Sequence, residues 1–181
     1  LALVFAQAGR FDDALPVLEE SIAWGVANFG ADDAEVGRYR ALRATLLMHL
    51  GRFDDAIAEA KAGLAILGTW YGPESVHLAD VLLTLGDAHG RKGQLEPVMP
   101  YLDRALICAR NGDNPEMVAA IETQRTIHFV RTGDLERAAP AADALVAAAE
   151  RTRGFASILN ALLVRGVVAK DRKRYADAER D

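Results

Sequence analysis

Hydrophobic and polar positions follow the period of an α-helix along most of the chain, and short glycine-containing turns interrupt them. The clearest stripe consists of residues three, one and three positions apart: Leu82, Leu85, Gly86 and His89. A facing stripe follows the next turn, at Val98, Leu102, Ala105 and Leu106. Such spacings place side chains on one face of a helix. The pattern therefore predicts helices joined by tight turns, and short links make neighbouring helices antiparallel.

Glycine, proline and capping residues indicate where each helix begins and ends. Asp33 and Asn114 are expected N-caps, and Pro115 stands at a first helical position. Pro73 is interpreted in the same way, as the start of a helix. The predicted helices cover residues 1–8, 12–28, 33–50, 54–70, 73–92, 96–110, 115–131, 135–151 and 154–171, and a further helix begins at Tyr175.

One turn motif returns along the chain at a nearly constant spacing. Residues 9–14 read Gly-Arg-Phe-Asp-Asp-Ala, and residues 51–56 repeat them unchanged, 42 positions later. Weaker copies lie at 93–98, 133–138 and 173–178, and the last has lysine in place of glycine. A repeat of this period predicts a solenoid, in which neighbouring repeats cover each other's apolar faces. The expected repeats form a single array, residues 1–181, with units 1–30, 31–72, 73–113, 114–153 and 154–181, of which the first and last are incomplete.

The third repeat carries a characteristic set of small and apolar residues. Leu85 with Gly86, then Gly93, then Ala105 with Leu106 match the pattern of the tetratricopeptide repeat (TPR). The chain resembles the TPR family over essentially its whole length. Because its repeats are longer than the usual 34 residues, it is similar to the longer variant of kinesin light chains and many bacterial proteins. The resemblance implies an all-α, right-handed superhelical solenoid of antiparallel helix pairs, and we expect the sequence to be a fragment of a longer protein.

Composition and charge argue against some classes of function. The 181 residues have a net charge of −5, which argues against general nucleic-acid binding. No apolar stretch approaches the roughly 20 residues that cross a membrane, and no cleavable signal is present, so the cytoplasm is the expected compartment. Residues 1–35 hold seven carboxylates against one arginine, and residues 151–181 hold eight cations against four carboxylates. This asymmetry is either a solvated surface or a means of joining copies end to end.

In TPR proteins the first helix of each repeat lines a concave groove that holds a peptide. Carrying those positions onto this sequence gives a mixed polar and apolar wall. The main peptide-contact candidates are Arg38, Thr45, His49, Asp80, Leu83, Asp87, Arg91, Thr123, Ile127 and Arg131. The same offsets add Ala41, Met48, Thr84, Ala120, Gln124, Val130, Asn160, Leu163, Val167 and Lys170. The family's clamp for a C-terminal carboxylate is not matched, because its lysines and asparagines are absent here.

Charged residues also stand at unusual places. Four arginines occupy positions where TPR helices usually pack apolar side chains: Arg40, Arg43, Arg125 and Arg165. A buried guanidinium needs a paired charge. Carboxylates such as Asp54, Glu59, Glu122 or Asp143 meet these arginines, or the arginines face solvent or the groove. We favour the second arrangement, which makes the groove more basic. The acidic pairs at 12–13 and 54–55 are expected to complement the helix dipole and bond free N–H groups.

No pattern typical of catalysis, of a cofactor or of a metal site is found. The four histidines, at 49, 77, 89 and 128, lack metal-ligand spacing. The single cysteine, Cys108, lies among apolar residues of a helix, where a thiol is expected to be buried and inert. We therefore expect no enzymatic activity, no cofactor and no metal.

The sequence favours a protein–protein interaction scaffold that binds a peptide or a helix in the concave groove, with no nucleic acid or membrane as partner. Two alternatives stay open. In one, the array is a regulatory or sensory segment of a larger bacterial multidomain protein, such as a Ser/Thr kinase or a transcription activator. In the other, it is a self-assembly module that forms homo-oligomers.

Overall fold

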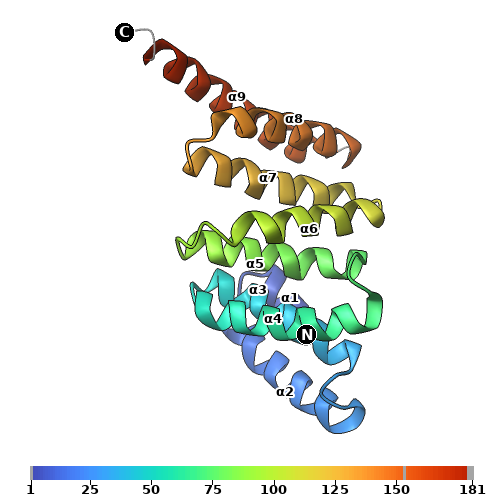
Figure 1. Cartoon of the computed structure of the whole chain (residues 1–181). Coiled ribbons are helices and arrows are strands. Elements are labelled where there is room, and N and C mark those ends of the chain that lie inside the picture. Colours follow the sequence, from blue (N-terminus) through green and yellow to red (C-terminus); the bar gives the residue numbers. More distant parts are fainter. Residues whose placement is uncertain (1, 153, 179–181) are drawn as a thin grey trace. The chain divides into compact units, whose positions relative to one another are not determined.

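The structure, a computed structural model, describes residues 2–152 and 154–178, and within these ranges its regular elements are helices (Figure 1). Two compact parts are distinguished, Leu1–Cys108 and Ala109–Asp181, called here the N-terminal part and the C-terminal part. The N-terminal part contains α1 (Ala2–Gln7), α2 (Phe11–Phe29), α3 (Ala34–His49), α4 (Phe53–Tyr71), the 3₁₀ turn η1 (Val76–Leu78), α5 (Ala79–Arg91) and most of α6 (Val98–Asn111). The C-terminal part contains α7 (Pro115–Arg131), α8 (Leu135–Thr152) and α9 (Phe155–Ala178).

Consecutive helices pack against each other inside each part. In the N-terminal part, α1 contacts α2, α2 contacts α3, α3 contacts α4, and α4 contacts α5. In the C-terminal part, α7 contacts α8 and α8 contacts α9. We call the odd-numbered helices A helices and the even-numbered ones B helices. Successive A helices also touch, α3 with α5 and α7 with α9, so each part has a layer of A helices beside its B helices.

The repeated turn keeps one geometry wherever it keeps its glycine. The turn glycines, with φ between +72° and +83°, are Gly9, Gly51, Gly93 and Gly133. Positive φ is accessible to glycine at little cost and to other residues only with strain. The turn after α3 shows the bonding, because Gly51 N donates to Met48 O at 3.1 Å and Arg52 N to Leu47 O at 2.9 Å. Each such turn satisfies carbonyls at the end of an A helix and starts the following B helix.

Both expected N-caps are confirmed. The Asp33 side chain accepts a hydrogen bond from Glu35 N at 2.8 Å, and the Asn114 side chain accepts one from Met117 N at 3.0 Å. Pro115 is the first residue of α7, where its missing N–H costs nothing.

The acidic pairs lie in the first turns of α2 and α4, as expected. They do not cap these helices, however. The N-cap residues are Arg10 and Arg52, which make no side-chain cap bond. Each of these arginines instead donates to the carboxylate three residues later, Asp13 or Asp55, at 2.7 Å. The carboxylates therefore fix the turn and favour the helix dipole without bonding the free N–H groups.

The prediction that Pro73 opens a helix is wrong. Ser75 caps the 3₁₀ turn by accepting a bond from His77 N at 3.4 Å, and α5 begins only at Ala79. Arg104 of α6 holds the loop before α5. Its Nε and Nη2 donate to Pro73 O at 3.2 and 3.1 Å. These bonds keep the Pro73 carbonyl directed at α6.

The turn predicted at residues 173–178 is also not formed. α9 runs as one helix through Tyr175 to Ala178 (Figure 1), so the predicted new helix at Tyr175 is wrong. Lys173 stands where the other copies of the motif have glycine, and lysine adopts positive φ only with strain. Helical hydrogen bonding therefore continues through the motif. Residues 179–181 of the fifth expected repeat lie outside the described range.

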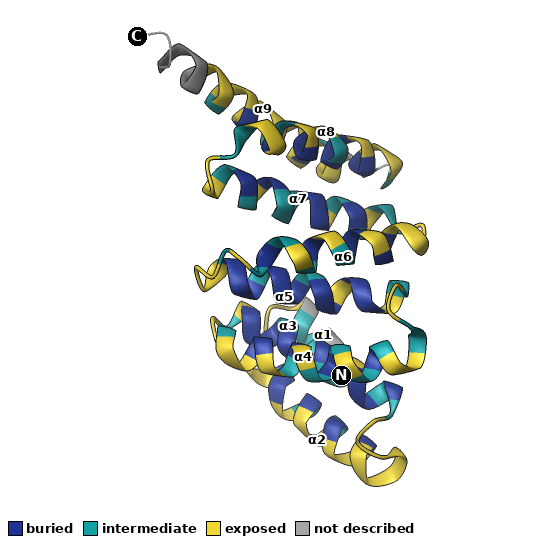
Figure 2. Ribbon diagram, in the orientation of Figure 1, coloured by how far each residue is buried: buried dark blue, intermediate teal, exposed yellow. Residues whose placement is uncertain are grey.

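The core lies where A and B helices meet. Leu82, Leu85 and Leu102 are fully buried, and a Cβ atom on Gly86 would lie only 2.7 Å from Leu102 Cδ2. The glycine thus allows the close approach of α5 and α6 that the two stripes predict. In the C-terminal part the core cluster consists of Leu145, Val146, Ala149 and Ala161. Figure 2 shows buried residues along α3, α5 and α8, whereas α9 is mostly exposed up to residue 173.

We predict that Leu102→Ala lowers the free energy of unfolding by about 2–5 kcal/mol, because it leaves a cavity against Gly86 that the backbone cannot fill. Urea denaturation followed by far-UV circular dichroism measures this loss. The matched control is Leu162→Ala on α9, where the side chain is 41% exposed and a change below about 0.5 kcal/mol is expected. Equal losses for both variants would contradict the helix register.

Candidate functional site

The predicted peptide-contact residues lie on A helices, on α3 and α5 in the N-terminal part and on α7 and α9 in the C-terminal part. We call the surface that they define the A face and describe it separately for each part.

The centre of the A face is closed in the N-terminal part. Thr45 Oγ1 lies 3.1 Å from Thr84 Oγ1, which joins α3 to α5, and Thr45 Oγ1 is also 3.3 Å from Ala41 O. Thr84 and Ala41 are buried, as is Met48, while Thr45 and Leu83 are half-buried. This stretch serves mainly as a packed wall between neighbouring A helices.

The charged candidates on α3 and α5 are mostly engaged within the protein. Arg38 pairs with Glu35 and donates to the Tyr71 hydroxyl at 2.9 Å. Arg91 Nε donates to Asp87 Oδ1 at 3.0 Å, and only 12% of the Asp87 side chain is exposed. A ligand at these positions would compete with existing bonds.

His49 is exposed, but its ring stacks on Phe11, with centroids 5.0 Å apart and planes 8° from parallel. The contact ties the end of α3 to the start of α2. His89 is buried, stacks on Tyr101 and shares a 2.7 Å hydrogen bond between its Nδ1 and Gln94 Oε1. Both rings thus have structural contacts with the preceding or following helix.

Asp80, on the first turn of α5, differs from the other charged candidates. Within the described residues its carboxylate makes no hydrogen bond or ion pair, and the side chain keeps an exposed surface. Desolvation by the surrounding protein nevertheless raises the pKa of Asp80 above its usual value. A carboxylate whose charge is poorly solvated would be stabilised by a cationic group of a ligand.

The A face of the C-terminal part contains a hollow of about 380 Å³ between the first turns of α7, the end of α8 and the first turns of α9. We call it the α7–α9 hollow. Its polar lining consists of Glu116, Thr123, Thr152, Ser157 and Asn160. The apolar lining comes from Ala119, Ala120 and Leu145. Three of these residues, Ala120, Thr123 and Asn160, lie on adjacent A helices and are among the positions that the repeat offsets give.

Several polar groups of this hollow are available to a ligand. Glu116 and Asn160 are exposed and make no hydrogen bond or ion pair within the described part of the chain. Thr123 Oγ1 donates to Ala119 O at 2.8 Å, which leaves its oxygen lone pairs as acceptors. The Asn160 amide offers both a donor and an acceptor, the combination that a peptide main chain requires.

Apolar side chains continue the A face farther along α7 and α9. Ile127 is 41% exposed, Leu163 62% and Val167 56%. Arg131, the last residue of α7, is exposed as well. The sequence prediction missed Ser157 and Glu116, which lie three and four positions before the candidates Asn160 and Ala120. Extending the offsets by one helical turn would have included them.

The four unusual arginines meet carboxylates, so the arrangement favoured from the sequence is wrong for the half-buried Arg40, Arg43 and Arg125, whereas Arg165 is also exposed to solvent. Arg40 and Arg43 of α3 contact Glu59 of α4 at 3.2 and 3.3 Å, and Arg43 also reaches Glu19 of α2 at 2.8 Å. These pairs link three helices in the N-terminal part.

The two arginines of the C-terminal part are paired in the same way. Arg125 lies 3.4 Å from Glu122, and Arg165 lies 3.7 Å from Asp143. Of the four carboxylates considered from the sequence, Asp54 has another partner, Lys92. Because all four arginines are neutralised locally, they do not make the A face basic.

Among the described residues, no three His, Cys, Asp or Glu side chains gather in a way that would hold a metal ion. In the same part of the chain, no helix has the length and hydropathy to cross a membrane.

Comparison with known proteins identifies the fold of this chain. No protein-family profile and no curated protein matches the sequence. The solved structure of BtubC (BKLC) from P. vanneervenii superposes with a TM-score of 0.82 at 20% identity, covering 99% of this chain and 73% of that chain. Two structures of a Podosopora anserina protein, described as a kinesin light chain with nearly identical TPR-like repeats, give TM-scores of 0.78 and 0.77 at 16% and 15% identity. They cover 99% of this chain and 86% and 87% of theirs.

The chain has a TPR-like fold. The all-α solenoid of antiparallel helix pairs predicted from the sequence is thereby confirmed. In this TPR-like chain the A face corresponds to the layer of first helices of the repeats.

We expect Glu59→Ala to lower the free energy of unfolding by about 1–2 kcal/mol, because Arg40 and Arg43 lose their common partner at a largely buried position. The control is Asp55→Ala, which removes an exposed ion pair with Arg52 and is expected to change stability by less than about 0.5 kcal/mol. Chemical denaturation of both variants provides the comparison. A smaller effect for Glu59→Ala than for Asp55→Ala would refute the linking role.

Asp80→Asn should raise the thermal unfolding midpoint at pH 7. A raised carboxyl pKa in the folded state means that the charged form is disfavoured there, so wild-type stability is lost as pH rises through that pKa. The amide carries no such penalty. The gain should therefore shrink on acidification and disappear below about pH 4, the ordinary Asp value. Melting curves between pH 3 and pH 8 test this, and a gain that grows on acidification would be inconsistent with the desolvated carboxylate.

Proposed function

We propose that this chain is a protein-interaction scaffold that binds an extended peptide along the A face. The observation that carries the proposal is the α7–α9 hollow, where polar side chains from adjacent A helices surround a space of about 380 Å³. TPR-like repeats, the fold found here, offer extended binding surfaces of this kind.

The hollow would hold one peptide unit by its main chain. The Asn160 amide would accept from a peptide N–H and donate to a peptide C=O, while Thr123 and Ser157 provide further oxygen acceptors. Main-chain bonding of this kind gives affinity with little dependence on the peptide's sequence.

Sequence preference would come from the exposed apolar residues. Ile127 on α7 and Leu163 and Val167 on α9 offer anchor points for two hydrophobic side chains of the peptide. The wall needs little rearrangement before binding, because α8 packs against both α7 and α9. A preformed site loses less conformational entropy when it binds.

The charges described above support a peptide rather than a nucleic acid as ligand. The arginines that looked available are paired with carboxylates, and the chain as a whole carries a net charge of −5. Nucleic-acid binding depends on unpaired cations facing the phosphates. The proposed role is the same whether the array works alone in the cytoplasm or as the regulatory segment of a larger protein.

The test begins with selection of binders from a displayed library of random 12-residue peptides on the immobilised chain. Asn160→Leu removes the main-chain donor and acceptor and fills the hollow, so we expect the selected peptides to bind this variant about tenfold or more weakly. Isothermal titration calorimetry measures the dissociation constants.

The matched control is Asn28→Leu, at an exposed asparagine near the end of α2, which should leave affinity unchanged. Circular dichroism verifies that both variants stay folded. Peptides that bind wild type and Asn160→Leu equally, or a selection that enriches no binder, would show that the α7–α9 hollow is not the site.

A further inference from the structure

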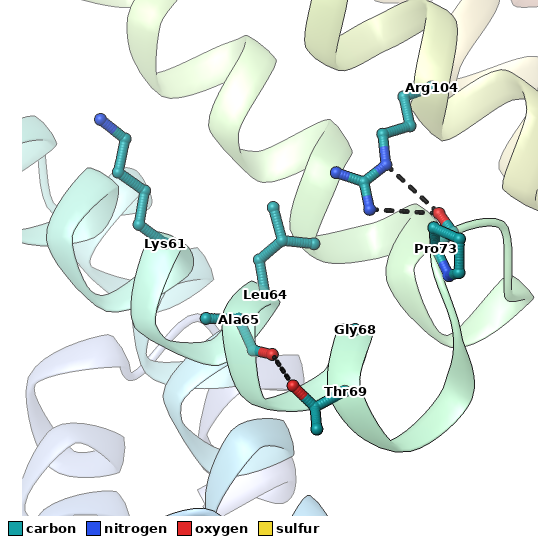
Figure 3. A pocket seen from close by; sticks show the side chains of 7 residues that line it. All are labelled: Lys61, Leu64, Ala65, Gly68, Thr69, Pro73 and Arg104. Carbon is teal, nitrogen blue, oxygen red and sulfur yellow. Dashed lines mark hydrogen bonds between the residues drawn. The ribbon is translucent and has the colours of Figure 1, made fainter.

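A second hollow lies among B helices of the N-terminal part, between α4 and α6, and no predicted A-face residue lines it (Figure 3). Its volume is about 420 Å³. We call it the α4–α6 hollow. Its lining is formed by Leu64, Ala65, Gly68, Thr69 and Pro73, with the cations Lys61 and Arg104 at its sides.

The hollow exists because of the residues on one stripe of α4. Lys61, Leu64, Ala65 and Gly68 are spaced i, i+3, i+4 and i+7 and therefore share a face. A Cβ atom on Gly68 would meet nothing within 4 Å, so the space above this residue is open. Figure 3 shows Leu64 between the side chains of Lys61 and Arg104.

Neighbouring repeats do not have this combination. The positions 42 residues earlier hold Glu19, Ile22, Ala23 and Val26, and those 42 residues later hold Asp103, Leu106, Ile107 and Arg110. In both, the first position is a carboxylate instead of a cation, and the last carries a large side chain instead of none. The α4–α6 hollow is thus a departure of the second repeat and not a property of the repeat itself.

No carboxylate stands among the residues that line the hollow. Lys61 is exposed and makes no hydrogen bond or ion pair within the described residues. Arg104 is held in place by a carbonyl, Pro73 O, which accepts from its Nε and Nη2 at 3.2 and 3.1 Å (Figure 3). Its charge is not neutralised by that contact.

Charges near Arg104 also affect the buried thiol of Cys108. Burial raises the pKa of Cys108, the Arg104 cation opposes that rise, and the Glu74 carboxylate adds to it. Glu74 follows Pro73 in the sequence and does not line the hollow. Lys61, on the other side, is the cation that an incoming carboxylate would meet.

We propose that the α4–α6 hollow is a second peptide-binding site, which takes an aliphatic side chain against Leu64, Ala65 and Pro73 while a nearby carboxylate of the same peptide pairs with Lys61. Arg104 adds positive potential at the opposite side. The ligand is an acidic peptide in which a leucine-like residue adjoins a glutamate or aspartate. The net negative charge of the chain repels an acidic peptide. Recognition therefore depends on the local positive charges of Lys61 and Arg104.

The experiment uses the ¹⁵N-labelled full chain and the synthetic peptide acetyl-Glu-Leu-Glu-Leu-Glu-amide, followed by NMR. We expect saturable shifts of the amides of residues 61–69 and of Arg104. The matched peptide with glutamine in place of each glutamate should bind at least threefold more weakly. Shifts confined to residues 116–123 and 157–160 would mean that the peptide uses the A face, and this or an absence of shifts would overturn the proposal.

Two variants test the site itself. Gly68→Val places a side chain in the open space, as Val26 does in the first repeat, and should weaken binding at least tenfold. Ala23→Val, at the exposed equivalent of Ala65 on α2, is the control and should leave binding unchanged. Circular dichroism verifies folding, which Gly68→Val should preserve because valine is a better helix former than glycine.

Lys61→Gln provides a test that does not alter the shape of the hollow. It should weaken binding of the glutamate peptide about threefold, as expected for an exposed ion pair, and leave the glutamine peptide unaffected. Equal affinity of the glutamate peptide for wild type, Gly68→Val and Lys61→Gln would exclude the α4–α6 hollow as a site. Since none of these residues belongs to the A face, the result is independent of the α7–α9 hollow.

Discussion

The structure depends on how closely A and B helices approach each other. At four contacts in the N-terminal part, a glycine faces the neighbouring helix so tightly that a Cβ atom would lie 2.7–3.0 Å from it: Gly25, Gly37, Gly63 and Gly86. The Cβ of an alanine at 63 would meet the carbonyl oxygen of Gly37, so here the backbones of α3 and α4 touch. This spacing lets the flanking leucines bury their whole side chains, the largest favourable contribution to folding.

The same close spacing explains the positions of the arginine side chains. Long side chains cannot enter the contact between two such helices and must leave it at the edge. Arg43 does so and reaches carboxylates on both neighbouring B helices, Glu19 and Glu59. The ion pairs therefore link helices, and little of the positive charge on the A helices is left for a ligand. What the A face offers instead is hydrogen-bonding groups and exposed apolar side chains, which suit a peptide.

The α4–α6 hollow lies where a single repeat departs from the common pattern. Gly68 opens the α4–α6 hollow at a position where the adjacent repeats carry valine and arginine. Ala119 and Ala120 line the α7–α9 hollow in the C-terminal part. A solenoid tolerates such local changes because each repeat contacts only its neighbours, so a space in one repeat does not disturb the others. One framework can thus carry two hollows with different chemistry.

Local sequence determined most helix boundaries, because turns and caps are short-range. The positive φ of Gly51, the capping bond of Asn114 and the place of Pro115 all involve residues within a few positions of each other. The peptide-contact positions were predicted from the repeat offsets, because each repeat copies the register of the one before it.

Tertiary structure decided the rest, and two predictions were wrong because distant residues competed with local signals. The Pro73 loop bonds to Arg104, 31 residues away, so the proline did not start a helix. Arg40 found Glu59 on the next helix, a choice that depends on side-chain reach across a contact. Both hollows likewise depend on which side chains fail to meet between helices. Such features are set by packing in three dimensions, which the order of residues determines only through the complete fold.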